Sequence, residues 1–247
     1  MKTYIKDFMP QWYSTWYCSL TVLSWILNYF FSTSFWAKDN RDVFALAQSG
    51  RRNSQLLELD TTALFLDRLY LDVTIFTSMT KEEYEITLKS SNIDEIIEIY
   101  KKYIKPQYHS CIQWNKFVFE DGNSIEVVDL LIRKRIANST LKFEYDCKRQ
   151  SIIDWVKNNQ NIEEGWVLFL LWLNRHILYD ETPKSESDNG GHVVVSTGID
   201  ENNNFIIYEP ISPRPNPHLI PVEKVLDAIW DWDGYNMVMI KDNPEHQ

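Results

Sequence analysis

Three residues far apart in the sequence carry the side-chain types that acyl transfer requires: a thiol, an imidazole and a carboxylate. The thiol is Cys18, in an uncharged segment (residues 8–37) with the apolar pattern of a buried helix that begins near the cysteine. The first peptide N–H groups of a helix carry partial positive charge and have no helical partner, so they stabilise a thiolate. Cys18 is therefore a candidate nucleophile, although a lone cysteine in an apolar helix is more often a packing residue.

The imidazole and the carboxylate lie in residues 190–210, GGHVVVSTGIDENNNFIIYEP, which predict two strands joined by an Asn- and Asp-rich turn. A turn centred between residues 201 and 202 pairs residues whose numbers sum to about 403. This register brings Glu209 within reach of His192 at the open end of the hairpin. Taken singly, His192 is more simply a strand-end histidine that meets solvent, and Glu209 an ordinary loop carboxylate. Together they predict that Glu209 holds one imidazole nitrogen while the other faces Cys18.

A fourth residue, Gln11, lies seven positions before Cys18 and is a candidate amide donor for an oxyanion hole. Metal chemistry has less support. His109, Cys111 and Cys147 are metal-ligand types, but a closed zinc site needs four ligands and their spacing matches no familiar pattern. There is no glycine-rich phosphate loop. We expect no metal and no cofactor.

The composition narrows the classes of partner. The 247 residues carry a net charge of −10, which argues against nucleic acid and against an anionic membrane surface. Three widely spaced cysteines and the absence of an apolar signal sequence fit a reducing, cytoplasmic location. The uncharged segment around Cys18 contains too many polar residues for a membrane span. The sequence leaves the oligomeric state open.

The secondary structure that must position these residues changes along the chain from mainly helices to mainly strands, which predicts an α+β fold. The first two-thirds favour helices, with capping side chains at Asp60 or Thr61, at Thr80 and at Asn92, and an amphipathic helix over 124–138. Within this part, residues 73–78 and 141–147 have strand character. The final third predicts strands over 165–174, 192–199, 205–210 and 235–241, with a helix over 221–232. His176 and His218 fall in loop-like contexts and are expected to face solvent.

Two segments resemble a known family. MPQWYSTWYCSLTVLSWILNYF (9–30) resembles the Gln-to-Cys helix of papain-like peptidases related to the leader-processing domains of bacteriocin exporters. GGHVVVSTGIDENNNFIIYEP resembles their His strand and the Asp-Pro that ends the next strand. Residues 57–84 and the loop before His192 are similar to the guanylyl-cyclase-domain-containing family, which shares the papain-like plan, although no nucleotide or metal motif supports a cyclase here.

The resemblance implies a single papain-like domain over 1–247, with a helical lobe over about 1–140 and a sheet lobe over about 141–247. It implies Cys18 as nucleophile, His192 as base, Glu209 as orienting residue and Gln11 as oxyanion donor. Three positions depart from the pattern. Ser19 stands where Gly is usual, Gln11 lies one position further from the cysteine than usual, and Glu209 replaces Asp or Asn.

The expected function is cysteine-dependent acyl transfer on a peptide or another acyl donor, with amide or peptide hydrolysis by a Cys-His-Glu triad as the main outcome. One alternative is an N-acyltransferase or amide-forming biosynthetic enzyme. Another is a catalytically silent binding protein that keeps the fold. The polar loop over 180–191 runs into His192 and is expected to cover the cleft as a solvated lid, which favours hydrolysis over transfer to an amine.

Overall fold

The computed structural model describes residues 22–23, 25–26, 29–30, 57–103, 105–106, 135–160, 167–183, 190–210, 217–234 and 236–242. Gln11, Cys18, His109 and Cys111 lie outside these residues, as do most of the helix predicted over 124–138 and part of the predicted lid. The helices and strands are α3 (Leu57–Asp67), β1 (Asp72–Phe76), α4 (Lys81–Lys89), α5 (Ile93–Tyr103), β2 (Lys142–Glu144), α8 (Arg149–Asn159), β3 (Val167–Asn174), α9 (Arg175–Tyr179), β4 (Gly191–Ile199), β5 (Asn204–Tyr208), β6 (His218–Pro221), α10 (Val222–Asp233) and β7 (Met237–Lys241).

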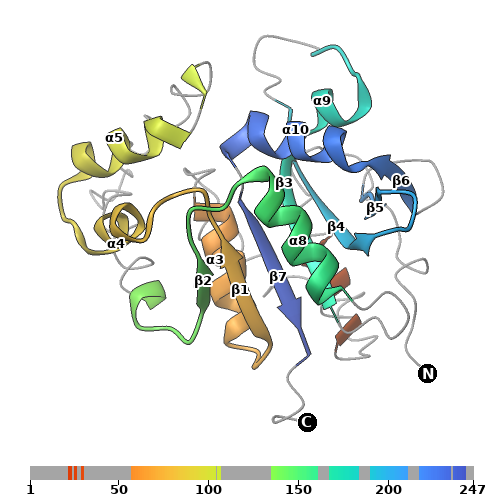
Figure 1. Ribbon diagram of the computed structural model, residues 1–247. Coiled ribbons are helices and arrows are strands. Elements are labelled where there is room, and N and C mark those ends of the chain that lie inside the picture. Colours follow the sequence, from red (N-terminus) through yellow and green to blue (C-terminus); the bar gives the residue numbers. More distant parts are fainter. Residues whose placement is uncertain are drawn as a thin grey trace, which may run out of the picture.

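The fold is α+β, and the described residues build a seven-stranded open sheet in the order β2-β1-β7-β3-β4-β5-β6 (Figure 1). Every neighbouring pair is antiparallel except β1 and β2, which run parallel. All eight residues of β3 are buried, as expected for a central strand of continuous apolar sequence. The sheet draws on both halves of the chain, because β1 lies between β2 and the C-terminal strand β7.

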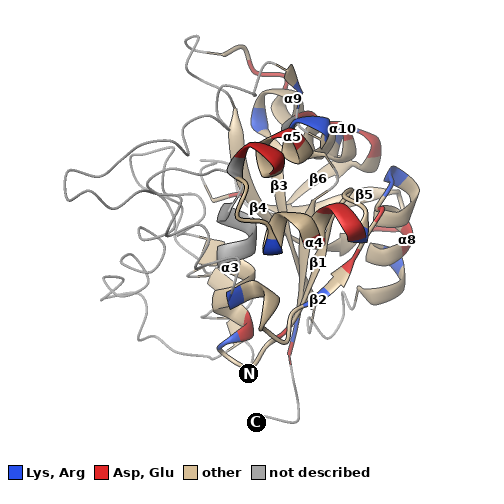
Figure 2. Cartoon of the chain, turned by 90° about the vertical axis from the view of Figure 1, so that its left-hand side faces the viewer, with Lys and Arg blue, Asp and Glu red and all other residues tan. Residues whose placement is uncertain are grey.

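Helices cover both faces of the sheet. One face packs against α3 and against six described helical residues between 22 and 30, and its core includes Val193 and Val195 of β4. The opposite face packs against α8 and α10, and its core includes Val194 of the same strand. Figure 2 shows the sheet between α3 on one side and α8 and α10 on the other. Successive strand residues point to opposite faces, so this division assigns each residue of β4 up to Ser196 to one layer.

The helices α4 and α5 form a small third core beside the sheet, in contact with Phe143 and Tyr145. The predicted capping box is confirmed, since the Glu83 amide donates to Thr80 Oγ1 (3.2 Å) and the Glu83 carboxylate accepts from the Thr80 amide (3.4 Å). Glu83 also binds Lys102 Nζ (2.8 Å) and the Tyr103 hydroxyl of α5. Desolvation by burial raises the pKa of Glu83, but these hydrogen bonds outweigh it and lower the pKa to about 2.

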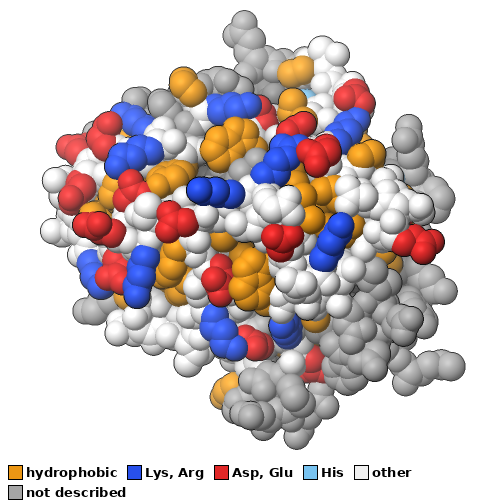
Figure 3. All heavy atoms as spheres, in the orientation of Figure 1, with side chains coloured by type: hydrophobic (Ala, Val, Ile, Leu, Met, Phe, Trp, Pro, Cys, Tyr) orange, Lys and Arg blue, Asp and Glu red, His pale blue; other side chains and the backbone are white. Residues whose placement is uncertain are grey.

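Arg149 at the start of α8 holds the two helices of the other layer together. Its guanidinium donates to the carboxylates of Glu223 and Asp227 on α10, with Nη1 2.6 Å from Asp227 Oδ1. Figure 3 shows that charges of both signs are interspersed over this face of the molecule. Among the residues that the structure describes, no helix is long and apolar enough to cross a membrane.

Candidate functional site

The β4–β5 hairpin has the register that the sequence predicts at its open end. Val195 pairs with Tyr208 and Ser196 with Ile207, so that the paired numbers sum to 403. Closer to the turn a β-bulge between Ser196 and Gly198 shifts the sum by one. The side chain of Gln160 fills this bulge, accepting from the Ile199 amide (2.6 Å) and donating to its carbonyl (3.0 Å). The bulge therefore lies beyond the pairs that place His192 and Glu209.

His192 and Glu209 meet on one face of the sheet. On the observed register they are diagonal neighbours on adjacent strands, a relation within reach of long side chains. His192 Nε2 lies 2.7 Å from Glu209 Oε1, and each side chain is only 2% exposed. A carboxylate only accepts hydrogen bonds, so Nε2 carries the hydrogen and Nδ1 is the basic nitrogen of this tautomer. The hydrogen bond predicted from hairpin counting is present.

A third side chain, which sequence reasoning missed, completes this arrangement. The Tyr179 hydroxyl donates to Glu209 Oε2 at 2.5 Å, so each carboxylate oxygen has its own donor. Tyr179 is the last residue of α9, and its ring packs against the core beneath α8 and α10. The sequence predicts a loop-like context at His176 and a polar loop over 180–191, and it predicts no helix between them. The available signal was Asn174, a good N-cap residue at the end of the long apolar strand.

The junction between β3 and α9 packs closely against Gly190, two residues before His192. The Asn174 side chain accepts from the His176 amide (2.9 Å) and donates to Asp231 Oδ2 of α10 (2.8 Å), while Lys105 binds the other Asp231 oxygen. Gly190 adopts a φ of 74°, and a Cβ there would lie 2.3 Å from Asn174 Oδ1. Only glycine fits this position without displacing the cap.

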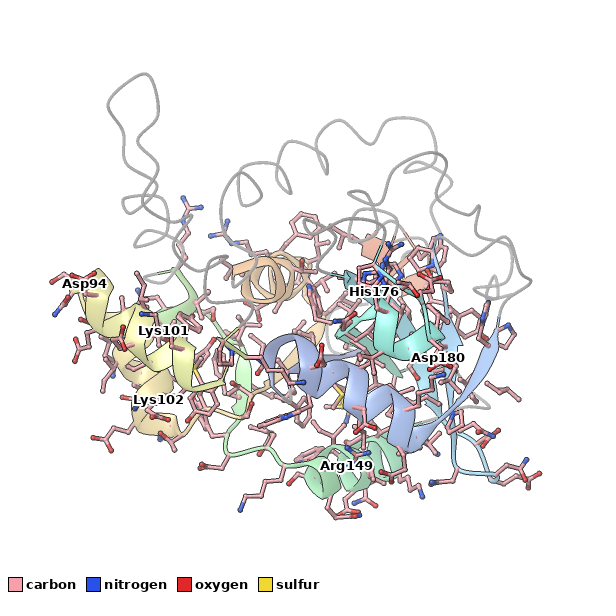
Figure 4. The ribbon with its side chains drawn as sticks, turned by 90° about the horizontal axis from the view of Figure 1, so that it is seen from above. Asp94, Lys101, Lys102, Arg149, His176 and Asp180 are labelled. Carbon is pink, nitrogen blue, oxygen red and sulfur yellow. The ribbon has the colours of Figure 1, made fainter. Side chains whose placement is uncertain are left out.

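The structure contradicts the prediction of a solvent-facing His176 and the prediction that His218 lies in a loop. His176 is not solvent-facing but 8% exposed, because the predicted loop is the helix α9 and its second residue packs against the strand end. Figure 4 looks down on this end of the sheet and shows His176 and Asp180 together at α9, well away from Arg149 on α8. His218 lies in β6 rather than in a loop, with Nε2 buried and its ring 6.3 Å from that of Tyr179 in an edge contact.

The described cysteine, Cys147, is a packing residue. It is 4% exposed, and burial raises the pKa of its thiol to about 11. A backbone hydrogen bond with Thr77 lowers the pKa and only partly offsets the effect of burial. Among the described ranges, no group of three or more His, Cys, Asp or Glu residues could hold a metal ion.

No model of a known protein family and no curated protein matches the chain. In the part of the chain that the structure describes, the class is defined only as an α+β protein with an open, mostly antiparallel seven-stranded sheet and a buried His-Glu pair whose carboxylate also accepts from the partly buried Tyr179.

Proposed function

We propose that the protein is a papain-like, cysteine-dependent acyl-transfer enzyme whose main reaction is amide or peptide hydrolysis. The buried pairing of His192 with Glu209 supports this proposal, since a carboxylate that fixes the tautomer of an imidazole is what a thiol nucleophile requires of its base. A second binding partner for the carboxylate, at 2.5 Å, limits its freedom to turn away.

In the proposed reaction Cys18 attacks the substrate carbonyl while His192 Nδ1 accepts the thiol proton. Gln11 and the Cys18 amide stabilise the oxyanion. The imidazolium then gives the proton to the leaving amine as the C–N bond breaks, which leaves a thioester on Cys18. A water molecule, deprotonated by His192, attacks the thioester and releases the acid and the free thiol.

The two faces of the sheet restrict where Cys18 can meet His192. The helical residues between 22 and 30 pack on the face of Val193 and Val195, whereas His192 alternates to the opposite face with Val194. His192 is the second residue of β4, so it lies at the end of the sheet. Cys18 precedes Val22 by four positions, which in the predicted helix corresponds to about 6 Å along its axis. The thiol must therefore meet the imidazole around the end of the sheet rather than through it.

The proximity of Cys18 and His192 that the proposal requires can be tested by cross-linking. Replacing His192 with Cys should allow a short bis-thiol-reactive cross-linker to bridge it to Cys18, because a thiol that reaches the imidazole places the two Cβ atoms close together, although beyond the roughly 3.5–4.5 Å of a relaxed disulfide. Ser196→Cys is the matched control, since Ser196 is also buried on the same face of β4, about 13 Å further along the strand. Equal cross-linking of both variants, or of neither, contradicts the proposed site.

A second candidate function is a catalytically silent binding protein. The side chains of His192 and Glu209 are each 2% exposed. A polar pair whose only role is to stabilise a core is buried to the same extent. The two candidates differ in whether a substrate carbonyl reaches the Cys18 thiol while His192 accepts its proton.

Activity decides between them. Fluorogenic peptide amides and acyl thioesters should be turned over by the unaltered protein and by Cys147→Ala, and not by Cys18→Ala or His192→Ala. Turnover that survives in Cys18→Ala contradicts thiol catalysis. Absence of turnover on every donor, together with no Cys18 cross-link to His192→Cys, favours the binding protein.

Product analysis separates hydrolysis from transfer. With a thioester donor and rising amine concentration, we expect the acid to remain the main product, because the polar loop before His192 favours a solvated acyl-enzyme. An amide product that dominates at low amine concentration and is absent in Cys18→Ala favours the N-acyltransferase instead.

A further inference from the structure

We propose that Tyr179 is a positioning residue, which fixes the Glu209 carboxylate so that this carboxylate can orient His192. The inference rests on the proposed function and adds a residue to its site. Three side chains form a continuous chain of hydrogen bonds: Tyr179 OH donates to Glu209 Oε2 at 2.5 Å, and His192 Nε2 donates to Glu209 Oε1 at 2.7 Å.

A glutamate needs such an anchor more than an aspartate does. Its side chain has one more rotatable bond, and its terminal torsion is broad and roughly two-fold, so the carboxylate plane can turn with little resistance. Fixing this torsion so that the carboxylate binds the imidazole costs conformational entropy. The Tyr179 hydroxyl binds the oxygen that His192 does not use and thereby fixes the plane of the carboxylate.

Tyr179 is itself held by the fold. Its ring packs against the core shared by β3, β4 and α10, and it contacts the His218 ring edge-on with an interplanar angle of 65°. The helix that carries it is fixed at both ends. Asn174 caps its first turn, and at its last turn the backbone amide of Asp180, a residue in the left-handed conformation, bonds to His176 O. The helix that carries this hydroxyl therefore follows directly on the end of β3, and that end of β3 pairs with the start of β4, the strand of His192.

The role assigned to Tyr179 is geometric. Its hydroxyl keeps its proton and stabilises the ionised carboxylate by donating to it, while the proton of the reaction moves between the thiol, His192 and the leaving group. Removal of the hydroxyl should therefore lower kcat with little change in KM. A lost hydrogen bond to a charged group corresponds to about a tenfold loss in rate.

The test compares Tyr179→Phe with Tyr208→Phe. Both variants lose one hydroxyl and keep the ring. Tyr208 is adjacent to Glu209 in sequence but packs on the other face of the sheet, and its side chain makes no hydrogen bond to the described residues. Proton and nitrogen NMR of the His192 ring reports the tautomer and the Nε2–H hydrogen bond whether or not the protein is an enzyme.

In the unaltered protein we expect one sharp, downfield Nε2–H signal. In Tyr179→Phe it should broaden or move upfield, with kcat about tenfold lower, while Tyr208→Phe leaves both unchanged. An unchanged signal in Tyr179→Phe overturns the positioning role even if Cys18 and His192 prove essential for turnover. A changed signal in a protein without turnover supports the positioning geometry and removes the proposed function alone.

A second variant guards against misfolding of the first. Glu209→Asp withdraws the carboxylate by one methylene, so it cannot reach both partners at the observed distances. It should broaden the Nε2–H signal while leaving the Tyr179 ring in place. A sharp, unshifted signal in folded Glu209→Asp contradicts the proposal.

Discussion

Replacing Glu209 with Ala or with Gln separates the contribution of its hydrogen bonds from that of its charge. Alanine removes the acceptor of both the His192 ring and the Tyr179 hydroxyl, so that one buried donor and one partly buried donor lose it. Glutamine keeps the shape, and its amide can accept from one of these groups and donate to the other if the tyrosine oxygen accepts. The two variants should therefore differ in stability more than their similar loss of charge suggests.

The size of the difference follows from burial. Each hydrogen bond to a charged acceptor contributes about 1.5–3 kcal/mol, and breaking a buried pair by removing one partner costs about 3–5 kcal/mol. The side chains of His192 and Glu209 are both 2% exposed, so solvent does little to compensate. We expect Glu209→Ala to lower the free energy of unfolding by about 4 kcal/mol and Glu209→Gln by about 1 kcal/mol.

Urea unfolding followed by circular dichroism measures this difference. With an m-value of about 3 kcal/mol/M, the midpoint should fall by more than about 1 M for Ala and by about 0.3 M for Gln. Both variants remain folded at room temperature, so turnover can be measured on each and should fall further in Glu209→Ala. Equal midpoints for the two variants would refute the claim that the hydrogen bonds of this carboxylate, rather than its volume, stabilise the site.

Three other perturbations test the surroundings of the site. Iodoacetamide at neutral pH should modify Cys147 more slowly than Cys18, because burial raises the Cys147 pKa to about 11; equal labelling in the folded protein contradicts the assignment of Cys18 as nucleophile. Gly190→Ala should destabilise the protein by about 2–3 kcal/mol through its positive φ and its clash with the α9 cap, as measured by thermal unfolding, and a neutral effect would show that the cap can shift. Glu83→Gln should cost about 1–2 kcal/mol at pH 7, after allowance for solvent screening. The pKa of Glu83 falls from 4.5 to about 2 on folding, so this stability is fully present above pH 4.5 and is lost as the pH falls through about 2; a cost that persists at pH 2 would contradict the ionic origin.

Much of the local structure was predictable because it depends on short-range chemistry. The capping residues Thr80 and Asn92 begin helices as predicted, and the apolar run ending at Asn174 forms a central strand. The partnership of His192 with Glu209 followed from counting across one turn, a constraint that needs no knowledge of the remaining fold. The α+β class is likewise confirmed, with the strand of 73–78 observed as β1.

What failed depended on packing between distant segments. The short helix α9 has no strong periodicity of its own, so neither the burial of His176 nor the position of Tyr179 could be predicted from local sequence. The sequence predicts a loop-like context for His218, whereas its pairing with Ile207 extends the sheet by one edge strand. The helix α3 begins at Leu57, before the predicted capping residues Asp60 and Thr61, so propensity at a single position did not determine its start.

The order of strands has a consequence for synthesis on the ribosome. β7, at residues 237–241, is the strand that joins β1 and β2 to β3 and the three strands beyond it. Until it has emerged, the nascent chain holds two separate strand groups, each with an unsatisfied edge that can pair with another chain. A ribosome adds about 5–20 residues per second, so these edges are exposed for seconds after their own sequences are complete. Slow elongation through the codons just before β7 should therefore favour aggregation of this protein more than slow elongation through the codons before β1.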